Sequence, residues 1–89
     1  MKCFKGRPPA HQIIEKKDIS VTECLENCRG LGFPLAGLVP NKCYCIQQEN
    51  MDKMTIASRL SCDGDCNTQH CGNKDFITIY NLSKETPIL

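Results

Sequence analysis

Cysteine offers this chain its widest choice of chemistry, because a thiolate can bind a metal ion, attack a substrate or form a disulfide. Eight of the 89 residues are cysteines, arranged as Cys3, Cys24-x3-Cys28, Cys43-x-Cys45, Cys62-x3-Cys66 and Cys71. Structural zinc sites favour Cys-x2-Cys turns or closely spaced histidine pairs, and the spacing of His11 and His70 gives no such pair. The even number of cysteines instead predicts a secreted disulfide framework without a metal site.

Catalysis is not expected from these residues. If all eight cysteines are oxidised, no thiolate nucleophile remains. The serines have no recognisable set of His and Asp partners, and Ser20 is better explained as a helix cap. Asp63, Asp65 and Asn67 alternate as calcium ligands do, but the glutamate that completes a calcium loop is missing, which favours a polar turn. We expect a protein that is not an enzyme and uses no cofactor.

A helix is predicted to begin at Ser20, because Ser20 and Glu23 have the spacing of a capping box. Apolar residues then recur at helical spacing on one face, at Val21, Cys24, Leu25, Cys28 and Leu31. Gly30 and Gly32 favour the end of this helix.

The remaining segments favour strands and turns. Residues 33–39 and 43–46 have strand composition, and Pro40-Asn41-Lys42 between them predicts a hairpin turn. Residues 76–80 alternate as a closing strand. Residues 1–18 are predicted to form an extended start, a loop ordered by prolines and a second short strand. Residues 47–61 could form a short helix, and residues 62–66 and 69–73 are predicted to be turns.

The cysteines of the helix and of the hairpin have matching spacings. Four residues along a helix and two along a strand each advance the chain by about 6–7 Å on one face. A helix laid along the strand could therefore carry two disulfides, either Cys24–Cys43 with Cys28–Cys45 or the crossed pairing. Geometry leaves both pairings open.

The other four cysteines connect the ends of the domain. Cys66 and Cys71 are placed in a short local loop, which leaves Cys3 and Cys62 to tie the N-terminus to the later segment. These elements together predict a small disulfide-rich α+β domain, with one helix packed on a short antiparallel sheet.

Length and charge set limits on the function. At 10.0 kDa the chain allows one domain, assigned to residues 1–80, with residues 81–89 as a flexible tail. The formal charge of +1 supplies no general field for nucleic acid, and no apolar run approaches the roughly 20 residues of a membrane span. No apolar segment follows Lys2, so we expect Met1 to be an introduced start or a cut inside a longer precursor.

Several motifs together resemble the WSC domain, an extracellular cysteine-rich module of fungal cell-wall stress sensors and Kremen receptors. The resemblance covers residues 3–80 and rests on Cys3-Phe4, the Cys-x3-Cys helix after Thr22, Gly32-Phe33 before Ala36-Gly37-Leu38, Cys43-Tyr44-Cys45, Cys62-x3-Cys66, Cys71-Gly72 and the final strand Ile77-Thr78-Ile79-Tyr80. The chain departs from the family at Leu35, Ile46 and Asn73, where an aromatic residue, a glycine and a glycine are usual.

The WSC resemblance implies a fold, a pairing of cysteines and a function. The fold is PAN/apple-like, and the implied disulfides are Cys3–Cys62, Cys24–Cys43, Cys28–Cys45 and Cys66–Cys71. The implied function is a non-catalytic extracellular module that binds cell-wall or matrix polysaccharide within a secreted or membrane-anchored protein. The alternative is a PAN/apple-like protein-interaction or structural module of a receptor.

Carbohydrate binding normally uses an exposed aromatic face and polar side chains that bond to hydroxyls. The chain has no Trp, and strand alternation turns Tyr44 away from the cysteines beside it, so Tyr44 either packs on the far side of the sheet or offers a sugar platform. Polar candidates for the same site are the loop residues Asn41, Lys42, Asp63, Asp65, Asn67, Gln69, His70 and Asn73.

Two further features bear on an extracellular surface. Asn81-Leu82-Ser83 is an N-glycosylation sequon, which makes Asn81 a candidate glycosylation site. The first 18 residues carry an excess of three positive charges, from Lys2, Lys5, Arg7, Lys16 and Lys17 against Glu15 and Asp18. This excess could favour an anionic glycan or an acidic partner, or the lysines could be merely solvated.

Overall fold

The protein forms a small disulfide-rich α+β domain, in which one helix packs on an antiparallel sheet, as predicted. The computed structural model describes residues 2–10, 12–66 and 69–82. Its elements are β1 (Lys2–Lys5), β2 (Gln12–Glu15), α1 (Val21–Gly30), β3 (Leu35–Val39), β4 (Lys42–Ile46), the 3-10 turns η1 (Gln48–Met51) and η2 (Arg59–Ser61), β5 (Thr55–Ala57), β6 (Gly64–Cys66), β7 (Gln69–Cys71) and β8 (Phe76–Asn81).

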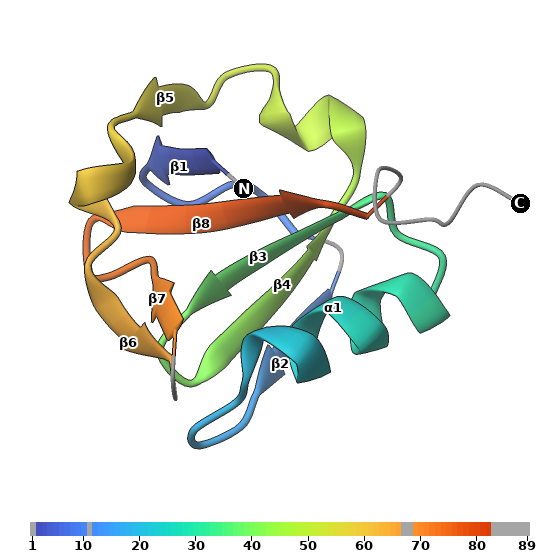
Figure 1. The fold of residues 1–89 in the computed structure, drawn as a ribbon. Helices are drawn as coiled ribbons and strands as arrows, with labels where there is room; N and C mark the ends of the chain where they lie inside the picture. Colours follow the sequence, from blue (N-terminus) through green and yellow to red (C-terminus); the bar gives the residue numbers. More distant parts are fainter. Residues whose placement is uncertain (1, 11, 67–68, 83–89) are drawn as a thin grey trace, which may run out of the picture.

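Six strands form the main sheet in the order β2-β4-β3-β8-β1-β5, and every neighbouring pair is antiparallel. Strands from the two ends of the chain therefore meet in its centre, where β8 lies between β3 and β1 (Figure 1). The short strands β6 and β7 form a separate hairpin. The helix packs against β3 and β4, on the same side of the sheet as the β6–β7 hairpin, and is seen at the lower right of Figure 1.

The helix begins and ends where the sequence predicts. The Ser20 hydroxyl accepts a hydrogen bond from the Glu23 backbone N–H at 3.1 Å, which satisfies one of the free donors of the first turn. At the other end the Phe33 N–H donates to Cys28 O, with Gly32 at a φ of +86° between them. A glycine in this left-handed conformation is the usual helix stop. Val21, Cys24 and Cys28 form the buried face of α1.

Strand alternation divides the core into two layers, one on each face of the sheet. The helix-side layer is rich in cysteine and includes Ala36, Leu38, Cys43, Cys45 and Leu82. The opposite layer contains Leu35, Val39, Tyr44, Ile46, Ile77 and Ile79. Residues of the 6–10 and 48–54 segments, such as Ala10 and Met51, pack against this second layer and partly cover it.

All eight cysteines are paired, and the pairing is the one that the WSC resemblance implies. The disulfides are Cys3–Cys62, Cys24–Cys43, Cys28–Cys45 and Cys66–Cys71, with Cα separations of 5.2–5.9 Å. Of the two pairings that geometry left open between helix and hairpin, Cys24–Cys43 with Cys28–Cys45 is therefore the one that forms. Disulfides at this density persist in oxidising compartments, which is consistent with an extracellular or secreted domain.

Two glycines allow backbones to approach more closely than any side chain would permit. A Cβ atom on Gly64 would lie 1.8 Å from Gly72 O, and one on Gly72 would lie 2.3 Å from Phe76 O. The backbone of β6 therefore rests on the segment that leads into β8. This close approach gives a packing reason for the glycine that follows Cys71.

Three expectations about segments need correction. Residues 47–61 contain two 3-10 turns and the edge strand β5, rather than one short helix. The segments expected as turns at 62–66 and 69–73 contain the paired strands β6 and β7. The expected tail is ordered at its start, because β8 extends to Asn81 and Leu82 is buried in the helix-side layer; residues 83–89 lie outside the described part of the chain.

Candidate functional site

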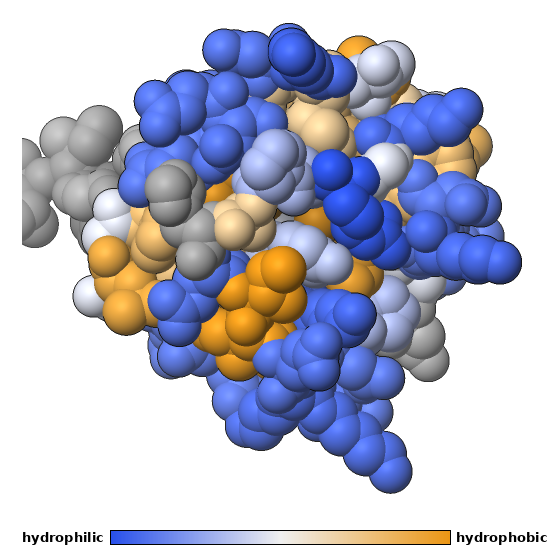
Figure 2. Space-filling view, turned by 180° about the vertical axis from the view of Figure 1, so that it is seen from behind, coloured by the Kyte–Doolittle hydropathy of each residue, from blue (hydrophilic) through white to orange (hydrophobic). Residues whose placement is uncertain are grey.

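An open hollow of about 280 Å³ lies beside the end of the β3–β4 hairpin, on the face of the sheet opposite the helix. We call it the hairpin hollow; its lining residues are Arg7, Val39, Pro40, Lys42, Tyr44, Asn73 and Lys74. The hairpin, the β1–β2 loop and the β7–β8 loop all contribute. It therefore brings together three of the predicted site residues, Lys42, Tyr44 and Asn73. Figure 2 shows the molecule from behind, the side opposite the helix, where hydrophilic side chains cover most of the surface.

Tyr44 forms part of the floor of this hollow. Its side chain lies away from Cys43 and Cys45, as alternation predicts, and packs in the layer opposite the helix. Only 8% of Tyr44 is exposed. With so little of the residue exposed, the ring does not offer an open face for stacking.

Arg7 holds the β7–β8 loop beside the hairpin. Its Nη1 donates to Phe76 O at 2.8 Å and to Gly6 O at 3.1 Å, and its Nη2 donates to Asn73 O and Lys74 O. One guanidinium thus satisfies four backbone carbonyls, three of them more than 60 residues away in sequence. The sequence shows Arg7 only as one member of a basic segment, because backbone acceptors leave no signature in residue type.

Asn73 organises the same loop through both ends of its amide. Its Nδ2 donates to Ser61 O at 2.8 Å and to Asp63 Oδ1 at 2.7 Å. Its Oδ1 accepts hydrogen bonds from the N–H groups of Asp75 and Phe76. These contacts bring together the two predicted site residues Asp63 and Asn73, and they use the full bonding capacity of the Asn73 amide within the protein.

Asn41 is also engaged in structure. It occupies the two-residue hairpin loop with a φ of 66°, a left-handed conformation that asparagine tolerates better than most residues. Its Oδ1 accepts from Asp18 N at 2.8 Å, and its backbone carbonyl accepts from Lys16 N at 3.1 Å. Asn41 therefore anchors the loop before the helix and does not line the hollow. Its neighbour Lys42 does line the hollow and lies 3.6 Å from the Glu15 carboxylate.

The other predicted ligand-binding residues lie outside the hairpin hollow. His70 is exposed on β7, and its cross-strand neighbour on β6 is Asp65. Asn67 lies outside the described residues. The candidate glycosylation site Asn81 is exposed at the end of β8 and lines a second hollow with Phe4, Leu35 and Met51.

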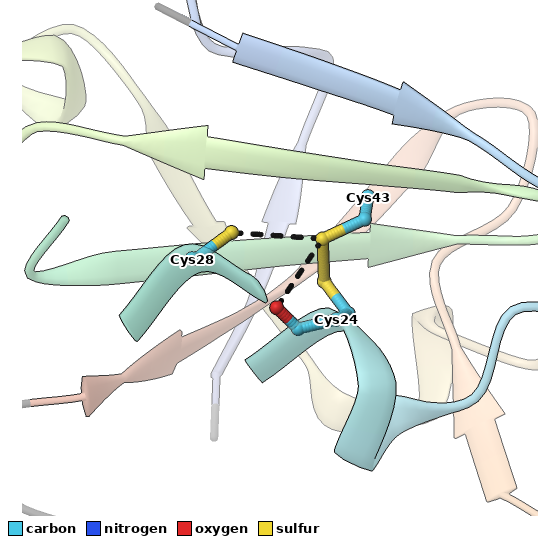
Figure 3. A group of neighbouring side chains, drawn as sticks. All are labelled: Cys24, Cys28 and Cys43. Atoms are coloured by element: carbon cyan, nitrogen blue, oxygen red, sulfur yellow. Dashed lines mark hydrogen bonds between the residues drawn. A yellow bond between two sulfur atoms is a disulfide. The ribbon is translucent and has the colours of Figure 1, made fainter. Parts of the chain in front are cut away.

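Three cysteine sulfurs approach one another closely enough to suggest a metal site. The Sγ atoms of Cys24, Cys28 and Cys43 all lie within 4.8 Å of one another (Figure 3). Cys24 is bonded to Cys43, however, and Cys28 is bonded to Cys45. Because none of these sulfurs is a thiolate, the cluster offers no ordinary ligand set to a metal ion. The 3.6 Å contact between Cys28 and Cys43 is packing between two neighbouring disulfides.

Burial perturbs one tyrosine on the helix side. Tyr80 packs against the helix-side core, and this burial raises the pKa of its hydroxyl above the ordinary value. The hydroxyl group therefore stays protonated at neutral pH.

Among the described residues, no helix is long and apolar enough to cross a membrane. No protein-family model matches this chain. No curated protein shows significant similarity to it.

Proposed function

We propose that the chain is a WSC-like, non-catalytic extracellular module that binds carbohydrate in the hairpin hollow. The observation that carries this proposal is the composition of the hollow, in which Tyr44 and two apolar residues, Val39 and Pro40, lie beside two lysines. Apolar surface accommodates the C–H face of a sugar ring, and ammonium groups donate hydrogen bonds to its hydroxyls. The ligand would be polysaccharide of a cell wall or extracellular matrix.

The size of the hollow limits how much ligand it can hold. Pockets for drug-sized ligands measure about 300–1,000 Å³, and the hairpin hollow lies just below this range at about 280 Å³. It fits one sugar unit of a longer chain. Affinity for a single unit would be low, so useful binding requires repeated modules or a repetitive polymer.

The test is retention of the oxidised protein on insoluble glucan, chitin and sulfated polysaccharide, with the protein displayed in several copies. Tyr44→Phe removes only the hydroxyl of a residue that lines the hollow, whereas Tyr44→Ala would remove a buried ring and destabilise the core. Tyr80→Phe is the matched control on the helix side. We expect weaker retention of Tyr44→Phe and unchanged retention of Tyr80→Phe. Absence of retention on every polysaccharide would reject carbohydrate binding.

A protein-interaction module is the second candidate, and exposed apolar side chains favour it. Ile56 on the edge strand β5 is 59% exposed, and Leu60 just beyond it is 88% exposed. Apolar groups beside an open strand edge are typical of surfaces that accept another chain. If no polysaccharide retains the protein, Ile56→Thr and Leu60→Ser become the variants with which to test binding to extracellular proteins.

A further inference from the structure

The hairpin hollow concentrates positive charge that the chain as a whole lacks. The formal charge of the protein is only +1, yet three of the seven residues that line the hollow are basic: Arg7, Lys42 and Lys74. None of the described residues that line it is acidic. Cations gathered around a concave surface attract an anion more strongly than the same charges spread over a convex one.

The charge of Arg7 is fixed in place but not neutralised. Its four described hydrogen bonds all go to backbone carbonyls, which orient the guanidinium without cancelling its charge. In the described part of the chain no carboxylate pairs with it. Holding a charged group in position before binding reduces the entropy lost when a ligand arrives.

The two lysines complete the site and are able to move. Lys42 lies 3.6 Å from Glu15 with 47% of its side chain exposed, and a surface pair of this kind is weak enough to exchange for a ligand. Lys74 is exposed, and among the described residues no carboxylate pairs with its ammonium group. Both ammonium groups can therefore turn toward a charged substituent in the hollow.

Resting on the proposed function, we infer that the hairpin hollow selects an anionic sugar unit, one that carries a sulfate ester or a uronate carboxylate. The substituent is held by the cations of Arg7, Lys42 and Lys74. The sugar ring lies against Val39, Pro40 and Tyr44. A neutral glycan would leave the concentrated charge without a partner.

The experiment compares three soluble probes of equal length: a heparin oligosaccharide, the same oligosaccharide after chemical desulfation and acetylation of the amines that this exposes, and a neutral β-glucan oligosaccharide. The heparin probe has sulfate and carboxylate groups, the desulfated probe keeps only carboxylates, and the glucan has neither. Binding is measured by calorimetry at low and moderate salt. We expect the order heparin, desulfated heparin, glucan, with affinity falling as salt rises. If desulfation leaves affinity unchanged, the recognised group is the carboxylate.

Lys74→Gln is the main variant, because it removes one charge without leaving a carboxylate unpaired. Losing a single charge about 4 Å from the anion predicts a roughly fivefold weaker affinity for heparin. Lys53→Gln changes the net charge equally, on an exposed lysine that does not line the hollow, and should leave affinity unchanged. Lys42→Gln should weaken binding as well.

The outcomes separate this inference from the proposed function. Equal binding of the glucan and of both heparin probes would overturn selection of an anion and leave carbohydrate binding standing. An equal loss of affinity in Lys53→Gln and Lys74→Gln would show unspecific attraction, and would also overturn the inference. Absence of binding to all three probes, together with no retention on the insoluble polysaccharides, would reject both the inference and the proposed function.

Discussion

Thr78 provides the sharpest test of how this small core is stabilised. It lies in the middle of β8, opposite Cys3 on one side and Leu38 on the other, and it is fully buried. Within the described part of the chain its hydroxyl has no hydrogen-bond partner. Thr78→Val replaces that hydroxyl with a methyl group of nearly the same size, so the packing is kept while the unpaired polar atom is removed.

The expected gain follows from two contributions. Burying a hydroxyl without a partner costs about 1–3 kcal/mol, and burying a methyl group in its place adds roughly 0.8 kcal/mol. Because part of the hydroxyl penalty relaxes in a real core, we expect the free energy of unfolding to rise by about 2 kcal/mol. For a domain of this size that corresponds to an increase in Tm of about 8–16 °C.

The assay is guanidinium unfolding of the oxidised protein, followed by circular dichroism, with Tm measured separately. Thr55→Val is the control, because Thr55 is exposed on β5 and its change should alter stability by less than about 0.5 kcal/mol. The m-value should be the same for all three proteins. A Thr78→Val protein less stable than the parent would refute the reasoning, since it would mean that the hydroxyl has a partner, such as an internal water.

The remaining predictions concern a titration, a close contact and a helix cap. Because burial raises the pKa of Tyr80, the folded state holds that proton more tightly than the unfolded chain does. The contribution of Tyr80 to the free energy of unfolding should therefore be constant below about pH 10 and be lost as pH rises through the folded pKa. Tyr80→Phe should flatten this alkaline limb in pH-dependent unfolding, and an unchanged slope would contradict the assignment. Gly72→Ala would place a Cβ 2.3 Å from the Phe76 carbonyl oxygen, so the free energy of unfolding should fall by about 1–3 kcal/mol in thermal unfolding. Gly30→Ala has open space around its Cβ and should not be destabilising. Equal effects of the two variants would argue against the close approach. Ser20→Ala should lose about 1 kcal/mol in chemical unfolding through the missing cap, and an unchanged midpoint would show that the helix does not depend on it.

The helix and the hairpin were predictable because their signals are local. The Ser20 cap, the Gly32 stop and the spacing of the cysteines each depend on residues close together in sequence, and all three are confirmed. The choice between two disulfide pairings needed more than spacing, because both fit a helix laid along a strand. The WSC resemblance implied the pairing that forms.

The parts that escaped prediction depend on contacts between distant segments. Strand β5 is three residues long, too short for a visible alternation, and it exists because its edge pairs with β1. Alternation located Tyr44 on the correct face, but its burial depends on loops that cross that face from elsewhere in the chain. Arg7 and Lys74 become part of one hollow only after the two ends of the chain meet in the sheet.

The plane of the sheet separates a crosslinked half of the molecule from a half without covalent ties. The side chains of Cys43 and Cys45 lie on the helix side, as does the Cys66–Cys71 pair. Cys3 shares that face, because it pairs with Thr78, which pairs with Leu38 of the helix-side layer, so all four disulfides stiffen that face. The face that contains the hairpin hollow is held by apolar contacts and by hydrogen bonds such as those of Arg7. Local opening costs least where no covalent bond resists it. The domain is therefore unequally compliant: displacing a segment of the helix-side face strains a disulfide, whereas displacing a segment of the opposite face breaks only noncovalent contacts.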